Sequence, residues 1–192
     1  MRTRRLLAVA FLAFPVIAFS SGSVSAGFTC TETGTSGPDI LTGTPGDDVL
    51  CGLGGNDELR GRRGHDVLLG GNGNHFLSGG GGDDDLRGGA GSDTLIGGPR
   101  DDVMRGGPGR DDGTGLAGDD FIYAGPGNDT QFDGGASGHD LVSGGAGNDR
   151  CIATIDGSGD DIALGGPGED TSYTDPGDER HAFEDERPCF AE

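Results

Sequence analysis

The stretch GGAGSDTLIGG, residues 88–98, carries the pattern that decides the fold. It reads as two glycines, any residue, a third glycine, any residue, Asp93, any residue and Leu95, and Gly97 and Gly98 then begin the same order again. Self-similarity at a fixed short period is the sequence signature of a repeat architecture, in which each unit stacks on its neighbours. The chain is therefore expected to be a solenoid.

One column of the repeat is an aspartate that recurs every nine residues. Ten positions follow one another at this spacing, and only His75 among them is not Asp. The register slips by two residues in GGASGHD (134–140) and by more in RCIATIDGSGDD (150–161), and then resumes. The column consists of Asp48, Asp57, Asp66, Asp84, Asp93, Asp102, Asp111, Asp120, Asp129, Asp140, Asp149, Asp161 and Asp170.

Two further columns keep the same phase. Glycine stands two residues before the aspartate, broken only by Arg100, at Gly46, Gly55, Gly64, Gly73, Gly82, Gly91, Gly109, Gly118, Gly127, Gly138, Gly147, Gly159 and Gly168. A large apolar residue stands two residues after it at Leu50, Leu59, Leu68, Leu77, Leu86, Leu95, Met104, Ile122 and Val142, and Gly113, Gln131 and Ser172 interrupt this column. Glycine permits positive φ and close backbone approach, and alternation along a strand turns one of three residues inward.

These columns predict an all-β fold, a parallel β-roll. Six turn residues and three strand residues make one repeat, and two repeats make an 18-residue coil with a strand on each side. Stacked coils then form two parallel sheets with the apolar columns between them. Asp48, Asp66, Asp84, Asp102 and Asp120 would line one edge of the roll, and Asp57, Asp93, Asp111 and Asp129 the other.

The composition demands a counterion. The net charge is −20, 43 of 192 residues are Gly, only 31% are hydrophobic, and there is no Trp and no Lys. Few apolar residues with high charge are typical of disorder, and this charge excludes nucleic acid and anionic membranes as partners. Stacked carboxylates repel unless a cation lies between them. Calcium accepts six to eight carboxylate and carbonyl oxygens, whereas magnesium demands near-ideal octahedral geometry.

We therefore expect several Ca²⁺ ions between successive turns of one edge. The thirteen aspartates of the column would supply carboxylates. The turn glycines would supply exposed carbonyls, and the candidates are Gly46, Gly55, Gly64, Gly82, Gly91, Gly109, Gly118, Gly127 and Gly147.

The repeat resembles the haemolysin-type calcium-binding, or repeats-in-toxin, nonapeptide. GGGGDDDLR (79–87), GGAGSDTLI (88–96) and GGAGNDRCI (144–152) match its pattern, and the resemblance covers about residues 40–172. It implies a parallel β-roll ordered by calcium, with ions between turns of one edge held by the aspartate and by turn carbonyls. His75 departs from the pattern and predicts a weakened or missing ion, and Arg100 predicts a distorted turn. The most regular part should be 40–105.

The two ends have features of their own. Residues 1–26 combine basic MRTRR, an apolar run too short to span a bilayer and small residues ending at Ala26, as in a secretory signal peptide. Removing its three arginines would take the net charge from −20 to −23. We expect an N-terminal cap at 27–39, the roll at 40–172 and an acidic C-terminal cap at 173–192.

The four cysteines are expected to form two disulfides in a secreted chain. Of the three possible connectivities, the one joining Cys51 to Cys151 would span about five strand spacings, over about 20 Å, and a disulfide needs Cα atoms within about 7 Å. The pairing of neighbours, Cys30 with Cys51 and Cys151 with Cys189, would staple each terminal segment to the adjacent repeat.

No catalytic motif accompanies the repeat: HExxH, GxSxG and the P-loop are missing from the sequence. The main hypothesis is a secreted, non-enzymatic calcium-binding module of a surface, matrix or adhesion type. The alternative is an extracellular enzyme or toxin-like protein with a composite site near 131–160. A third interpretation is a solenoid whose flat face binds a cell-surface glycan or protein. We expect a monomer without stable membrane insertion.

Overall fold

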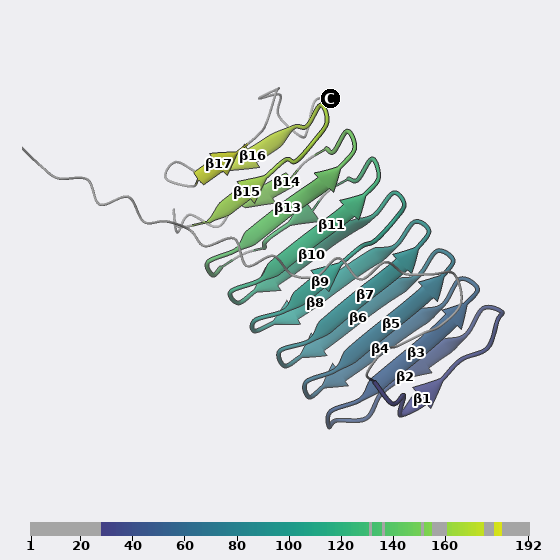
Figure 1. The fold of residues 1–192 in the computed structure, drawn as a ribbon. Coiled ribbons are helices and arrows are strands. Elements are labelled where there is room, and N and C mark those ends of the chain that lie inside the picture. The colour runs from purple at the N-terminus through teal and green to yellow at the C-terminus, as the bar shows by residue number, and fades with distance from the viewer. Residues whose placement is uncertain are drawn as a thin grey trace, which may run out of the picture.

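Two parallel sheets lie face to face and run the length of the molecule like the sides of a flattened spiral (Figure 1). The computed structural model describes residues 28–130, 132–135, 137–150, 152–154, 161–174 and 179–181. The nine-stranded sheet consists of β1 (Glu32–Thr33), β3 (Val49–Gly54), β5 (Val67–Asn72), β7 (Asp85–Ala90), β9 (Val103–Arg105), β11 (Phe121–Pro126), β13 (Leu141–Ala146), β15 (Ile162–Leu164) and β17 (Glu179–His181). The eight-stranded sheet consists of β2 (Ile40–Thr42), β4 (Glu58–Arg63), β6 (Phe76–Gly81), β8 (Thr94–Pro99), β10 (Asp112–Ala117), β12 (Phe132–Asp133), β14 (Ile152–Thr154) and β16 (Ser172–Thr174).

The strand register confirms the predicted β-roll. Odd-numbered strands pair only with odd-numbered ones and even with even, always in parallel, so the chain changes sheet at every turn. Val49 pairs with Val67, and Leu59 pairs with Leu77, so each residue lies against its equivalent two repeats later. This is the coil of two nonapeptides. Beyond Asp120 the coils lengthen, since Phe121 pairs with Leu141 and Leu141 with Ile162.

The two residues added near 134–140 are separated in the structure. Thr130 keeps the register of the earlier coils, because its N–H donates to Asp111 O at 2.9 Å just as the N–H of Asp112 donates to Asp93 O. Phe132 pairs with Gly113, which is one residue beyond that register, and Ser137 bridges Ala117, which is two beyond it. One residue is therefore added between Thr130 and Phe132, and a second before Ser137, whereas the sequence pattern places both in GGASGHD.

The core between the sheets is a pair of stacked apolar columns. The buried members are Leu41, Leu50, Leu59, Leu68, Leu77, Leu86, Leu95, Met104, Ile122, Phe132, Val142 and Ala163. Phe132 corrects the expected gap at Gln131, because the added residue moves Phe132 into the core register, where it is fully buried. Its ring lies beside Gly113, where a Cβ would come within 3.3 Å of the ring edge. The large side chain thus fills the space that the glycine leaves.

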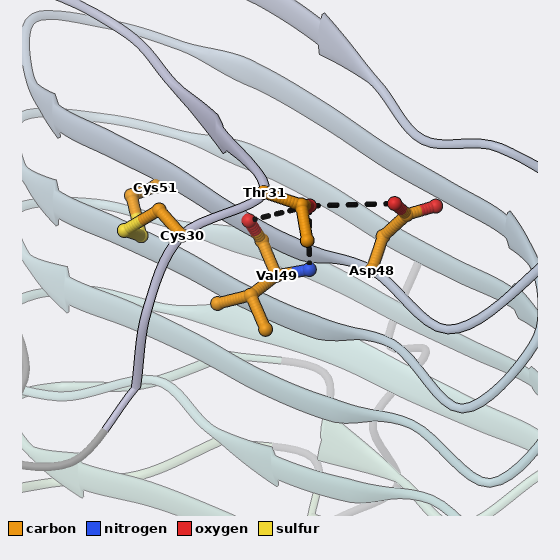
Figure 2. Close-up of a disulfide and its surroundings, with 5 residues drawn as sticks. All are labelled: Cys30, Thr31, Asp48, Val49 and Cys51. Carbon is orange, nitrogen blue, oxygen red and sulfur yellow. Dashed lines mark hydrogen bonds between the residues drawn. A yellow bond between two sulfur atoms is a disulfide. The ribbon is translucent and has the colours of Figure 1, made fainter.

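The N-terminal segment lies against the nine-stranded sheet. Cys30 forms the expected disulfide with Cys51 in β3, with a Cα–Cα distance of 6.0 Å (Figure 2). Phe28 reaches Arg87 in β7, whose Cζ is 5.2 Å from the ring centroid. Cys151 and Cys189 lie outside the described residues, so their pairing stays a prediction. Within the described ranges no helix is long and apolar enough to cross a membrane.

Candidate metal-binding edges

The aspartate column divides between the two edges of the roll, as the period requires. The edge that we name the Asp48 edge carries Asp48, Asp66, Asp84, Asp102, Asp120, Asp140 and Asp161, and the Asp57 edge carries Asp57, His75, Asp93, Asp111, Asp129, Asp149 and Asp170. All of these side chains are buried, with at most 7% of their surface exposed. A buried carboxylate is costly unless it is paired or hydrogen-bonded.

One oxygen of each carboxylate is used by the fold itself. The backbone N–H of Asp84 donates to Asp102 Oδ1 in the next coil at 2.8 Å, and the same bond recurs along both edges. It persists where the coils lengthen: the N–H of Asp120 donates to Asp140 Oδ1 at 2.8 Å across 20 residues, and that of Asp140 to Asp161 Oδ1 at 2.7 Å across 21. The aspartates therefore join successive coils even without a metal.

At most of these aspartates the other carboxylate oxygen has no hydrogen-bond donor within the described part of the chain. This holds for buried Oδ2 atoms at Asp66, Asp84, Asp93, Asp102, Asp111, Asp120, Asp129, Asp149 and Asp170. Native structures leave few buried polar atoms without a partner, and a row of them calls for an explanation. A row of cations along each edge is one, because each ion would satisfy the oxygens of the turns beside it.

Burial also raises the pKa values of these aspartates. Burial, helped by neighbouring carboxylates and opposed by the backbone N–H bond, raises the pKa of Asp102 to about 8 and that of Asp111 to about 7. Burial likewise raises the pKa to about 6 at Asp66, Asp93, Asp120, Asp129 and Asp149. A nearby cation would lower these pKa values, and Asp102 in particular needs one to be fully ionised at neutral pH.

The first glycine of each turn leaves room for the second carboxylate oxygen. A Cβ on Gly106 would lie 2.6 Å from Asp111 Oδ2 and 2.5 Å from the carbonyl oxygen of Ala124 in the next coil. A carboxylate and a carbonyl of the following coil therefore converge on one small space. No cluster of three or more His, Cys, Asp or Glu side chains suited to a metal occurs in the described ranges. Carboxylate with carbonyl oxygens is a donor set that suits calcium, whereas zinc sites use Cys, His and carboxylate side chains.

The predicted carbonyl-bearing glycines are required by the stacking. Gly55, Gly64, Gly82, Gly91, Gly109, Gly118 and Gly147 have positive φ. A Cβ on Gly55 would come within 2.6 Å of Gly37 O, so even an alanine would separate the coils. Gly127 is equally crowded by Gly109. Gly46 is different: its φ is not positive, and the nearest atom to a Cβ would be Thr44 Oγ1 at 3.8 Å.

His75 keeps the hydrogen-bond ladder but offers no carboxylate oxygen. Its Nδ1 accepts the N–H of Asp57 at 3.2 Å, as Oδ1 does elsewhere. A carbon of its ring, Cδ2, faces Gly70 where other turns place Oδ2, and its buried Nε2 has no hydrogen-bond partner among the described residues. Burial lowers the pKa of His75 despite the nearby Asp57 carboxylate, so the ring is neutral. The weak or missing ion at this turn stays a prediction.

Arg100 adapts to the glycine position that it occupies. Its φ is +92°, and its N–H donates to Ala117 O at 2.5 Å, so the turn keeps the connection to the next coil. Non-glycine residues seldom adopt this conformation.

The residue before many of the aspartates forms a second ladder, which sequence reasoning missed. The N–H of Asn74 donates to Asn56 Oδ1 at 3.0 Å, and that of Asp119 to Asp101 Oδ1 at 3.0 Å. His65 takes part through Nδ1, which accepts the N–H of Asp83 at 3.2 Å. A signal is present in the sequence, because Asn, Asp and His recur there and each can accept a hydrogen bond. The repeat pattern alone treats this position as variable.

Comparison with protein families identifies the repeat. A family model described as the RTX calcium-binding nonapeptide repeat (4 copies) matches residues 33–68, 52–86, 60–95, 87–116, 105–130, 134–153 and 155–178. These matches span most of the chain, which therefore belongs to this family and is a calcium-binding repeat protein. A search of curated proteins gave no match.

Proposed function

We propose that the chain is a secreted, non-enzymatic module that folds when it meets extracellular Ca²⁺. The observation that carries this proposal is the row of buried Oδ2 atoms without hydrogen-bond donors, of which Asp84, Asp93, Asp102 and Asp111 are central members. Two such rows in a chain of net charge −20 disfavour the compact state until cations neutralise them.

Secretion fits this chemistry. The signal-peptide pattern of residues 1–26, the disulfide between Cys30 and Cys51, and a need for calcium all agree with an extracellular setting. Extracellular calcium modules bind at about 10⁻⁴ to 10⁻³ M. Since metal binding supplies folding free energy, the chain would remain unfolded before export and fold outside.

The test is far-UV circular dichroism of residues 27–192 in EGTA and then in rising calcium, with magnesium as the control. A cooperative gain of β-structure with calcium alone is expected. A chain that is already fully folded in EGTA, or that responds equally to magnesium, would contradict the proposal. A hydrolase panel on the folded chain tests the enzymatic alternative, which places a composite site near 131–160.

The downstream role that we propose is binding to a cell-surface glycan or protein through a flat face. The outer face of the nine-stranded sheet supports this role, because Phe121 and Tyr123 of β11 are 40% and 39% exposed. On the adjacent strands, Phe121 pairs with Val103 and Leu141, which are also apolar. Exposed apolar patches on soluble proteins mark interaction sites. Saturable, calcium-dependent binding to cells that Phe121→Ser with Tyr123→Ser abolishes, without loss of the folded state, is the expected result. Equal binding by this variant would contradict this role.

A further inference from the structure

The first turn on each edge differs from the later turns that the structure describes. The turns GTSGPD (34–39) and GTPGDD (43–48) carry threonine as their second residue, where most later turns carry glycine. In the second of them, the N–H of Thr44 donates to Asp48 Oδ2 at 2.5 Å and its hydroxyl donates to the same atom at 2.9 Å. In the first, Thr35 makes the same two bonds to Asp39 Oδ2, at 2.6 and 2.9 Å.

These bonds occupy the oxygen that the internal turns leave without a donor. Asp48 and Asp66 are consecutive on one edge, and both are buried, with 7% and 1% of their surface exposed. Asp66 Oδ2 has no hydrogen-bond donor among the described residues, whereas Asp48 Oδ2 has two. Burial does not account for the difference between these neighbours. The threonine does, because it supplies two donors to a carboxylate oxygen that would otherwise face a cation.

The backbone conformation also distinguishes the first two turns from the later ones. The second residue of the later turns has positive φ even where it is not glycine, as at Leu53 (+75°) and Arg62 (+87°). Such a conformation is strained for these residues, so the internal turns require it. Thr35 and Thr44 do not adopt it, and neither Gly37 nor Gly46 has positive φ. The first turns are therefore built to a different design, in which N–H groups rather than cations meet the carboxylate.

A third threonine ends the ladder on the Asp48 edge (Figure 2). Thr31 Oγ1 accepts the N–H of Val49 at 2.9 Å, and lies 3.0 Å from Val49 O and 3.3 Å from Asp48 Oδ1. In the next coil the equivalent N–H, that of Val67, donates to the backbone oxygen of Asp48. The Thr31 hydroxyl thus stands in for a preceding coil. The disulfide of Cys30 with Cys51 lies directly beside it.

We infer that the N-terminal coil is a metal-independent end of the two calcium columns, in which Thr35 and Thr44 replace the cation at Asp39 and Asp48. This inference rests on the proposed function, since it distinguishes one coil from others that need calcium. It removes Asp48 from the expected ligands. It also gives the roll a direction: the N-terminal coil folds first and offers a template onto which calcium adds the following coils.

The physical reason is the cost of nucleation. A solenoid coil contacts only its neighbours, so a terminal coil has half the contacts of an internal one and needs other stabilisation. The disulfide between Cys30 and Cys51, which are 21 residues apart, restricts the unfolded chain. The bonds from Thr35 and Thr44 do not neutralise the carboxylates, but they provide hydrogen-bond donors for them without a metal. Once one coil exists, each later coil closes a loop of only two nonapeptides onto it.

The test is hydrogen exchange by mass spectrometry on residues 27–192 with the disulfide intact, in EGTA and in saturating calcium. We expect segment 31–51 to be protected in EGTA, and segment 79–120 to be protected only with calcium. The double variant Thr35→Ala with Thr44→Ala should lose protection of 31–51 in EGTA by about tenfold or more. Thr42→Ala, in β2 between the two turns, is the matched control and should leave it unchanged.

A second variant tests the inference because it should create an additional calcium site at Asp48. Thr44→Gly turns GTPGDD into GGPGDD, which has the form of the internal turns. Calcium titration should then show additional bound calcium relative to the parent chain, because Asp48 Oδ2 is released. Stoichiometry unchanged by Thr44→Gly would overturn the role assigned to Thr44.

The outcomes separate this inference from the proposed function. If segment 79–120 gains no protection with calcium, the proposed function fails. If that segment responds to calcium but 31–51 exchanges freely in EGTA, only the metal-independent end is overturned. Protection of 31–51 that survives in the double variant would also overturn it, because the threonines would not be its cause.

Discussion

The half of the roll before Asp120 and the half after it form the same hydrogen bonds between aspartates of successive coils, but with different numbers of residues per coil. In the first half the aspartates of one edge lie 18 residues apart, as at Asp48 and Asp66. In the second half the coils have 20 and 21 residues, yet the bonds from Asp120 to Asp140 and from Asp140 to Asp161 are 2.8 and 2.7 Å long, like those before them. One added residue lies before Phe132 of β12 and another lies inside the turn that ends at Asp140, yet the hydrogen bond between successive aspartates keeps its length. The geometry of the edge, rather than the period, is the invariant of this fold.

The largest expected effect on the calcium dependence of folding comes from breaking the edge in its regular half. Asp102→Ala removes an Oδ2 donor atom for calcium and leaves the buried N–H of Asp84 without its acceptor, and an unsatisfied buried donor costs about 1–3 kcal/mol. We expect the calcium midpoint of folding, followed by circular dichroism, to rise by about tenfold or more. Asp102→Asn keeps an amide oxygen as acceptor and should lie between Ala and the parent chain. Equal midpoints for all three would show that the edge does not carry the fold.

Phe132 tests how the irregular half keeps its core. It is fully buried beside Gly113 in a part where the coil is longer, so Phe132→Ala should lower the free energy of unfolding in calcium by about 3–5 kcal/mol. Leu86→Ala, in the regular half, should cost about 2–5 kcal/mol and serves as the comparison. Urea unfolding measures both. A cost under about 1 kcal/mol at Phe132 would contradict its place in the core.

Protons should partly replace calcium, and more so at the centre than in the irregular half. The folded pKa values of Asp102 and Asp111 are raised by burial to about 8 and about 7, above the unfolded value of about 3.9. A raised folded pKa contributes stability that is fully present below about pH 4 and is lost as the pH rises through the folded value. In EGTA, β-structure should therefore increase as the pH falls from 8 to 5.

The same titration compares the halves. Asp149 has a pKa raised to about 6, so hydrogen-exchange protection near 141–150 should be lost at lower pH than protection near 94–117. Less β-structure at pH 5 than at pH 8 in EGTA would refute the sign of this dependence.

His75→Asp should repair the Asp57 edge. The change exchanges a neutral ring with an unpartnered buried Nε2 for a carboxylate whose Oδ2 can face a cation. Calcium titration should show higher stoichiometry and a midpoint several-fold lower. His65→Asn is the matched control, because His65 is exposed and Asn performs its ladder role at Asn56 and Asn74. An increase in bound calcium for the control as well would argue against the assignment of His75.

The smallest effect is expected at Arg100. Its φ of +92° is strained for a side chain with a Cβ, and relief of such strain is worth about 1 kcal/mol at the low end. Arg100→Gly should therefore raise the melting temperature in calcium by a few degrees, since about 1 kcal/mol corresponds to about 2–8 °C. Arg100→Ala keeps the strain and should give no increase. A lower melting temperature for the glycine variant would show that the exposed guanidinium, 3.9 Å from Asp83, matters more than the backbone.

The order of amino acids is enough to establish the features that repeat. The period of nine places Asp, Gly and Leu in phase, and a parallel roll is the arrangement that buries the Leu column and aligns the Asp column. The two edges and the family followed from that period, because identical units must stack identically, and the Cys30–Cys51 disulfide followed from the pairing of neighbouring cysteines.

The contacts between atoms of one coil and atoms of the next became known only from the folded arrangement. It separated the two added residues around Phe132, revealed the ladder of Asn56, Asn74 and Asp101, and set Thr35 and Thr44 apart from the residues that replace them in later turns. These contacts join residues in different coils or across one turn, and they depend on φ at single positions and on the direction of one oxygen. A column of letters contains the residue types, but the hydrogen bond exists only once neighbouring coils are in place.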